Sequence, residues 1–305
     1  MDVNDVHKLG GLQAAIDASL DNGLPVYLSR DVEVSETVVL PNVNGIKIIG
    51  TGSYGSGHMD HPFTGPRSAI IWTGEPGGTV LEVGSANTAI YDVALHAKPR
   101  RAPIEDAASV GVVLTNVSGD GVGTGGLSWH NFTADGFREA AIQIGTDRST
   151  SNCDTSTFTG RTLFVSCRRG MHCLNDMGMG FHFDHVYSRM TRDTFRFEAG
   201  GGLSVGNVTV TRPRNLNNHG YDPAALLSLG SVQSNSGDFL LSQVKLDAEA
   251  QACKLLDCDQ PGQSRTKFGT VRASWNKHTG NIFSPLDLMP GHAVSIDQYD
   301  TRSDA

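Results

Sequence analysis

No stretch of this 305-residue sequence approaches the run of roughly 20 apolar residues that a membrane-spanning helix requires. The opening residues, MDVNDVHKLGG, lack the basic and apolar segments of a secretory signal peptide. We therefore expect no membrane partner and synthesis in the cytoplasm without signal-peptide export. A copy found outside the cell would leave it by another route, such as lysis.

The sequence is also poor in helix-favouring residues and in positive charge. Glu and Lys, which suit helices, number only 8 and 7, against 24 Asp and 17 Arg. Asp together with 36 Gly suits turns, so the composition favours a β-rich protein. The net charge of −8 argues against sequence-independent nucleic-acid binding, which needs a basic surface, so we expect no nucleic-acid partner.

Cysteine is scarce and odd in number, with Cys153, Cys167, Cys173, Cys253 and Cys258. An odd count of cysteines, without the close spacing of a disulfide framework, predicts reduced and mostly buried thiols. Bridges from Cys167 to Cys173 and from Cys253 to Cys258 are the alternative that the spacing leaves open.

Only one segment has a clear helical stripe. In LGGLQAAIDASLDNG, the apolar residues Leu9, Leu12, Ile16 and Leu20 fall near one face of a helix, and an Asn-Gly pair then ends it. After this helix the sequence changes to short β-type runs closed by Gly, Pro or Ser, among them PVYLS, EVSETVVLP and SAIIWTG.

A short pattern recurs along the rest of the chain: an apolar residue, two further positions, and a second apolar residue. It is found at Ile90-x-x-Val93, Trp129-x-x-Phe132, Phe183-x-x-Val186, Val205-x-x-Val208, Leu241-x-x-Val244 and Phe268-x-x-Val271. The shortest interval between successive second positions is 22 residues, from Val186 to Val208, and longer intervals contain insertions rich in Gly, Asn and Pro. Such spacing is typical of a solenoid whose coils stack and whose extra residues bulge out at the turns.

If each pattern is one coil, the second apolar residues line one interior column. The predicted column is Phe132, Leu163, Val186, Val208, Val244 and Val271. The position before each is polar, namely Asn131, Thr162, His185, Asn207, Gln243 and Thr270. These polar side chains either hydrogen-bond along the stack or are solvated turn residues.

The segment LQAAIDASLDNGLPVYLSRDVEVSETVVLPNVNGIKIIGTG resembles the opening of the β-helices of the pectate-lyase superfamily. That superfamily includes pectin-degrading enzymes, polygalacturonases and bacteriophage tailspikes, and this chain is closest in style to the tailspike and virion members. The resemblance implies an all-β fold, a right-handed parallel β-helix with an N-terminal capping α-helix. We expect a single domain, 1–305, with the cap at 1–24, β-helix coils at 25–300 and a tail at 301–305.

The sequence departs from the enzymes of that superfamily. The N-T-D, D-D, G-H-G and R-I-K series of polygalacturonase-type hydrolases is absent, and the pattern of clustered Asp with an Arg base found in pectate lyases is not present. The resemblance therefore implies a fold without specifying an activity.

Carboxylates of the central coils are the candidates for catalysis. Glycosidases need two carboxylates about 5–10 Å apart, and stacked strands lie about 4.8 Å apart. Asp184 or Asp193, together with Asp154 or Asp176, could meet that geometry. The alternative is that these residues cap turns, as Asp does in any Asp-rich solenoid.

No metal or cofactor is expected. Zinc needs three or four convergent ligands, and the pairs His58/His61 and His182/His185 have no further ligands at a suitable spacing. Alternation along FHFDH predicts that His182 faces solvent. The glycine run SGDGVGTGGLS is not followed by Gly-Lys-Ser/Thr, so it is no phosphate-binding loop.

Basic residues recur six positions after the second apolar residue of most coils. They are Arg138, Arg169, Arg192, Arg214 and Lys277, with Ala250 as the exception. Residues at one offset would form a basic stripe along the solenoid. Stacked like charges repel, so the stripe requires neighbouring acids such as Glu139 or Asp193, or an anionic partner.

Two functions fit these features. The first is a bacteriophage virion structural protein, a capsid decoration or spike-like β-helix located in the virion, that also binds host-surface glycans. We expect it to form a homotrimer, to contact other virion proteins and to bind an acidic polysaccharide. The alternative is a polysaccharide lyase or glycoside hydrolase acting on acidic polysaccharide through an unfamiliar site.

Overall fold

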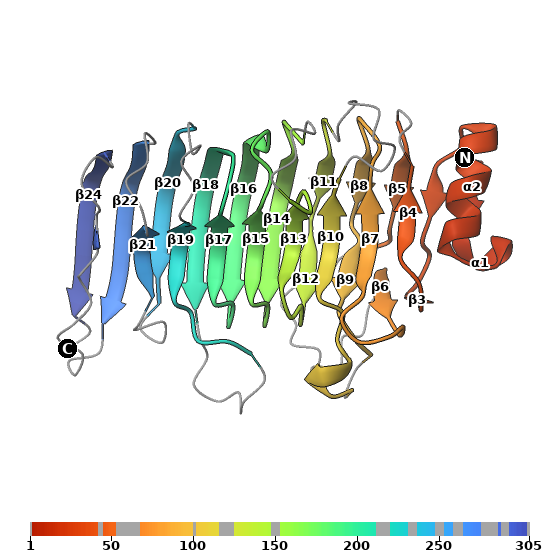
Figure 1. The fold of residues 1–305 in the computed structure, drawn as a ribbon, viewed down its shortest axis with the longest axis horizontal. Helices are drawn as coiled ribbons and strands as arrows, with labels where there is room; N and C mark the ends of the chain where they lie inside the picture. The colour runs from red at the N-terminus through yellow and green to blue at the C-terminus, as the bar shows by residue number, and fades with distance from the viewer. Residues whose placement is uncertain are drawn as a thin grey trace.

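The computed structural model describes residues 2–41, 45–52, 68–99, 102–115, 125–147, 153–211, 220–230, 237–247, 253–258, 265–275, 286–287 and 293–303. Within this part of the chain the strands form a fifteen-stranded and a nine-stranded sheet, and neighbouring strands run parallel. The strands stack along the long axis from the N-terminal helices to the C-terminal β24 (Figure 1).

The nine-stranded sheet contains one short strand from each coil. Its strands are β4 (Val38–Leu40), β7 (Thr79–Val83), β10 (Val110–Leu114), β13 (Ala140–Ile144), β15 (Arg169–Cys173), β17 (Asp193–Phe197), β19 (Ala225–Leu229), β21 (Lys254–Cys258) and β23 (Leu286–Asp287).

The fifteen-stranded sheet contains two short segments per coil at its N-terminal end and one long strand per coil later. The main series is β1 (Asn4–Asp5), β2 (Val26–Tyr27), β5 (Lys47–Ile49), β8 (Ala89–Tyr91), β11 (Ser128–His130), β14 (Thr157–Val165), β16 (Met179–Arg189), β18 (Gly201–Thr211), β20 (Phe239–Leu246), β22 (Arg265–Trp275) and β24 (Ala293–Ser303). The second segments are β3 (Val32–Val34), β6 (Ala69–Trp72), β9 (Ala94–His96) and β12 (Thr133–Asp135), and β12 pairs with the second half of β14.

The chain alternates between the two sheets as it advances. Strand β16 pairs with β18 in the larger sheet, whereas β15 pairs with β17 and β17 with β19 in the smaller one. This connectivity defines a parallel β-helix, and the predicted all-β fold is confirmed. Strand β24 continues to Ser303, so regular structure extends past the predicted end of the coils at residue 300.

The recurring apolar pattern marks a bend within the larger sheet. Phe183 and Val186 are buried in the core, whereas Asp184 and His185 between them are half-buried and exposed. The strand bends where two consecutive side chains face outward. The spacing differs from the strict alternation of a flat strand for this reason.

The predicted interior column is correct except at Leu163. Thr162, and not Leu163, pairs with Val186, which pairs with Val208. Leu163 points the other way and lies in a separate buried cluster with Val165 and Met190. The register between β14 and β16 shifts between Phe158 and Arg161, because β14 has one extra residue there. A one-residue slip reverses the face to which every later side chain points.

Aromatic side chains fill the central coils. The rings of Phe158 and Phe183 stack with centroids 4.5 Å apart and planes 5° from parallel. Phe183 also meets Phe195 edge-on at 5.3 Å, and Phe197 meets Phe239 at 4.9 Å. These contacts join successive coils into one continuous core.

The N-terminal end of the solenoid is covered by helices α1 (Val6–Leu9) and α2 (Leu12–Asn22), as the capping prediction requires (Figure 1). Leu12, Ala15 and Ile16 are buried against the first coils. Leu9 and Leu20, predicted on the same face, are 42% and 40% exposed. The buried stripe of this helix instead includes Ala15 and Ser19.

One further helix in the described part of the chain is the 3-10 turn η1 (Ile104–Asp106). None of the described helices is long and apolar enough to cross a membrane.

Candidate functional site

The four carboxylates singled out from the sequence lie at three different positions of the coil. Asp154 and Asp176 precede β14 and β16, at the turn that leads from the smaller sheet to the larger one. Asp184 lies at the outward bend of β16, and Asp193 is the first residue of β17. Asp184 and Asp193 therefore belong to different sheets.

The carboxylate of Asp184 has a structural role, because it forms hydrogen bonds with neighbouring groups of the larger sheet. Its carboxylate accepts a hydrogen bond from the Gly160 N–H at 2.9 Å and another from His182 Nε2 at 3.0 Å. Gly160 has φ +68° and lies where β14 has its one extra residue, so its amide would otherwise lack a ladder partner. This bond is the main reason why the pKa of Asp184 is lowered. The side chain of His182 is 42% exposed, which confirms the prediction that it faces solvent.

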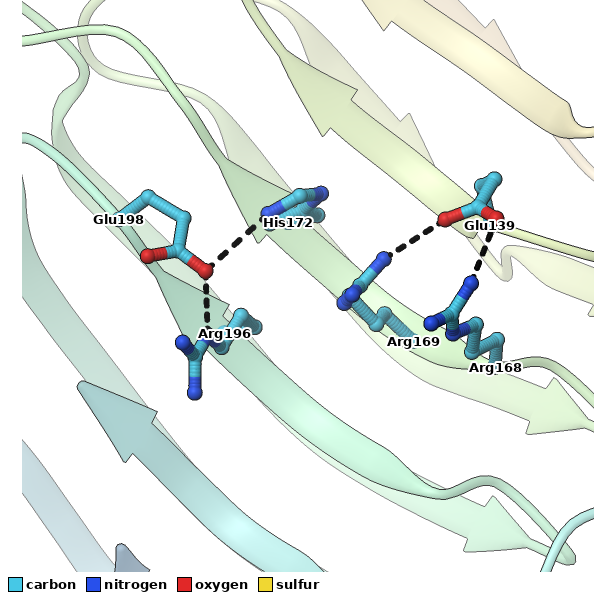
Figure 2. A network of polar contacts seen from close by, with 6 residues as sticks. All are labelled: Glu139, Arg168, Arg169, His172, Arg196 and Glu198. Carbon is cyan, nitrogen blue, oxygen red and sulfur yellow. Dashed lines mark hydrogen bonds and ion pairs between the residues drawn. The ribbon is translucent and has the colours of Figure 1, made fainter. Parts of the chain in front are cut away.

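Charged side chains gather instead on the outer face of the smaller sheet, around β15 and β17. We call Glu139, Arg168, Arg169, His172, Arg196 and Glu198 the charged network; Figure 2 shows the contacts among them. Across the two strands, Arg169 pairs with Asp193 and His172 pairs with Arg196. Parallel pairing thus sets four polar side chains next to one another.

Glu139 joins the two arginines at the start of β15. Its Oε1 lies 2.7 Å from Arg168 Nη1 and its Oε2 lies 2.9 Å from Arg169 Nη1. One carboxylate therefore holds two guanidinium groups, as Figure 2 shows. Charge-assisted hydrogen bonds of this kind fix the orientation of both partners.

Glu198 organises the other half of the network. Its Oε1 lies 2.7 Å from Arg196 Nε and 4.0 Å from His172 Nε2. Arg196 also donates from Nη1 to the hydroxyl of Ser228 in the next coil. Gly230, just after β19, leaves room for this pair, because a Cβ there would lie 1.9 Å from Glu198 Oε2.

Burial and neighbouring charges shift two titratable groups here. Burial lowers the pKa of His172 to about 4, and the positive charge of Arg169 acts in the same direction. Burial raises the pKa of Asp193, while Arg192, Arg169 and Arg196 act in the opposite direction. At neutral pH His172 is therefore uncharged within a group of arginines.

Two buried nitrogen atoms of the charged network have no hydrogen-bond partner within the described residues. They are Arg169 Nε and His172 Nε2. Buried polar atoms are normally paired, so these two nitrogen atoms are exceptions within the charged network.

The predicted basic stripe is displaced by one residue in the coil of β15. The Arg168 N–H donates to the Phe137 carbonyl at 2.9 Å and the Arg192 N–H donates to the Cys167 carbonyl at 3.2 Å. These bonds place Arg168, and not Arg169, between Arg138 and Arg192 in successive coils. The extra residue in β14 causes this shift. We call Arg138, Arg168 and Arg192 the arginine column. Arg214 and Lys277, the other members of the stripe, lie outside the described residues.

Sequence reasoning did not find Arg168, His172 and Arg196. A signal for two of them was present, because polar residues three positions apart recur in successive coils. The pairs are Arg169/His172, Asp193/Arg196 and Lys254/Asp257, and Ala225/Ser228 is the exception.

The five cysteines are all free and buried, so the prediction of reduced thiols is confirmed and neither alternative bridge is formed. Burial raises the pKa of Cys167, Cys173 and Cys253 to about 12. Thiols of this kind are unreactive. Among the described residues no group of three or more His, Cys, Asp or Glu side chains could hold a metal ion. His58 and His61 lie outside them.

No family model and no curated protein matches this chain. Among solved structures, the chain is similar to the crystal structure of the Agl-KA catalytic domain, with a TM-score of 0.48 and 8% identity over 99% of this chain and 68% of that chain. It is also similar to the crystal structure of the Dettilon tailspike protein, with a TM-score of 0.44 and 8% identity over 93% of this chain and 64% of that chain.

This chain therefore spans only part of each of these two proteins. The predicted parallel β-helix is established by the strand register of this chain itself. At this identity no activity is carried over.

Proposed function

We propose that this chain is a structural β-helix protein of a bacteriophage virion, of the decoration or spike type, and that the arginine column attaches it to an acidic polysaccharide of the host surface. The proposal includes a homotrimer and contacts with other virion proteins. The continuous core supports a rigid, elongated role, because each coil stacks directly on the next.

The observation that carries the attachment role is the arginine column itself. Arg138, Arg168 and Arg192 occupy corresponding positions in successive coils, about 4.8 Å apart along the axis. Arg138 and Arg192 are exposed, and in the described part of the chain Arg192 forms no ion pair. Guanidinium groups recognise carboxylates through paired hydrogen bonds.

The chain as a whole repels anions, with a net charge of −8. The six residues of the charged network nevertheless contain three arginines and two glutamates, with His172 uncharged. Arg138 and Arg192 add positive charge at the edge of the network. An acidic ligand would therefore be directed to this face.

The test is retention on an array of acidic and neutral polysaccharides. We expect the protein to bind acidic members and to lose at least tenfold in affinity when Arg168→Ala is combined with Arg192→Ala. Binding should also weaken at high salt. Arg265→Ala is the matched control, because Arg265 lies on the larger sheet with a side chain that is 78% exposed.

Two results would contradict the attachment role: no acidic polysaccharide is retained, or the double variant binds as well as the natural protein. The native mass of the same variants tests assembly separately. A lower mass with unchanged polysaccharide binding would assign the column to a contact between proteins.

The alternative, a polysaccharide lyase or hydrolase, is favoured by one observation. Asp193, the first residue of β17, is a carboxyl with a raised pKa set among arginines, and Glu198 follows the end of the same strand. Raised carboxyl pKa values are typical of general acids. Release of oligosaccharides from an acidic polymer, abolished by Asp193→Asn, would establish the enzyme.

A further inference from the structure

A groove lies on the outer face of the larger sheet at its C-terminal coils, away from the charged network. Its volume is about 630 Å³, within the usual range for small-ligand sites. Strands β20, β22 and β24 line it, with Ser242, Gln243, Lys267, Thr270, Asp297 and Gln298 among the lining residues.

The groove contains the polar column that the sequence places beside the interior residues. Gln243 pairs with Thr270 and Thr270 with Gln298, so the three side chains follow one another about 4.8 Å apart. In earlier coils two side chains of this column form a hydrogen bond with each other, of 3.0 Å between Asn207 Nδ2 and His185 Nδ1. This bond shows that side chains of the column reach one another.

In the groove, the polar side chains of this column do not form such hydrogen bonds within the described residues. Among the described residues, no side-chain hydrogen bond involves Gln243, Thr270 or Gln298. Each amide offers donors and an acceptor, and the threonine hydroxyl offers both. The groove thus presents donors and acceptors in alternation, which is what a ligand with several hydroxyl groups requires.

The charges of the groove cancel. Lys267 Nζ lies 3.0 Å from Asp297 Oδ2, so one cation and one anion are already paired. Leu240, the strand partner of Lys267, is 44% exposed and offers an apolar surface at the same edge. The chemistry favours an uncharged ligand that has both a polar edge and an apolar face.

An extended peptide fits this place poorly. Peptides that add to a sheet bind at an unpaired strand edge. Here β22 is already paired with β20 on one side and with β24 on the other. The ligand must therefore bind through side chains on the face of the sheet.

We infer that this groove binds a neutral sugar unit of an oligosaccharide through Gln243, Thr270 and Gln298. This site is separate from the arginine column, because the column lies beside the smaller sheet and the groove lies on the larger one. The two sites would recognise sugars of different charge.

The test uses the full chain on an array of neutral and acidic oligosaccharides, followed by calorimetry with the neutral oligosaccharide that is retained most strongly. We expect the double variant Gln243→Ala with Gln298→Ala to weaken its binding at least tenfold. Lys245→Ala, on the same strand but outside the groove, should bind normally. An unchanged thermal midpoint shows that the variants are folded.

Three results would overturn the inference. No neutral oligosaccharide is retained, or its binding is unchanged in the glutamine double variant, or its binding is lost in Arg168→Ala with Arg192→Ala. The last result would place neutral sugars at the arginine column. Loss of acidic binding alone would leave the groove intact and would concern only the proposed function.

Discussion

Gln13 of helix α2 forms two hydrogen bonds with the backbone of Val39. Its side-chain oxygen accepts from the Val39 N–H at 2.9 Å, and its side-chain nitrogen donates to the Val39 carbonyl at 3.2 Å. Val39 lies in β4, the first strand of the nine-stranded sheet. A single side chain thus takes the place of a missing neighbouring strand. An exposed strand edge can pair with a strand of another chain, and the contact with Gln13 blocks this edge at Val39.

We expect Gln13→Ala to lower the free energy of unfolding by about 1–3 kcal/mol, because it leaves both backbone groups of Val39 unpaired. The variant should also associate more readily at high concentration. Urea denaturation and light scattering measure the two effects. Leu20→Ala on the same helix is the control and should change stability little, because Leu20 is 40% exposed. Equal stability of the two variants would show that the edge contact is unimportant.

Thr162 occupies an interior position at which the later coils have valine. It is fully buried, and within the described residues its hydroxyl has no hydrogen-bond partner. We expect Thr162→Val to stabilise the protein by about 1–2 kcal/mol, because a buried unpaired hydroxyl costs free energy. Thermal denaturation checks this. A destabilised variant would indicate that the hydroxyl has a partner.

The sequence predicts the repeating elements of this fold well. The helical stripe and the apolar spacing depend on residues close together in the chain, so α2 and the interior residues Val186 and Val208 are found directly. Leu163 is misplaced because one extra residue at Gly160 reverses the pattern. No local feature of the sequence indicates this bulge, which is seen only from the pairing of β14 with β16.

The candidate site was harder to predict for the same reason. Glu139 meets Arg168 and Arg169 although 29 and 30 residues separate them. Contacts of this kind depend on the exact length of each coil. The sequence therefore predicts a stripe of arginines but places Arg169 at the position that Arg168 occupies.

The bond from Gly160 to Asp184 makes one contribution to stability pH-dependent. Because the folded-state pKa of Asp184 is lowered, the carboxylate contributes its full stabilisation above the unfolded pKa of about 3.9. The contribution is lost as the pH falls through the lower folded value. His182 and His185 are the other titratable groups that act on this carboxylate.

We expect Asp184→Ala to be less stable than the natural protein at pH 7 and to approach it in stability below about pH 3. Urea midpoints at both pH values measure the difference. An equal difference at pH 7 and at low pH would show that the carboxylate charge does not matter.

His172 makes a second contribution whose dependence on pH has the same sign as that of Asp184. Its pKa is lowered to about 4 in the folded protein, whereas an unfolded histidine titrates near about 6.5. Between these values the unfolded chain binds more protons, so stability rises with pH in that window. We expect His172→Gln to flatten this part of the stability profile. Nuclear magnetic resonance of the imidazole gives the folded pKa directly, and a value near 6.5 would contradict the prediction.

Gly230 controls the position of the Glu198–Arg196 pair. A Cβ at this residue would lie 1.9 Å from Glu198 Oε2 and 3.0 Å from Arg196 Nη2. Because the obstructing atoms belong to side-chain ends, the chain can fold after they move. We therefore expect Gly230→Ala to displace Glu198, to break its 2.7 Å contact with Arg196, and to leave the strand pairing of β19 unchanged.

A crystal structure of Gly230→Ala checks this displacement, and titration of His172 in the same variant provides a second measurement. Glu198 raises the pKa of His172, so its removal should lower that pKa further. Gly125→Ala is the matched control, because a Cβ there would meet nothing within 4 Å. If Glu198 keeps its contact with Arg196 in Gly230→Ala, the small residue after β19 does not position the charged network.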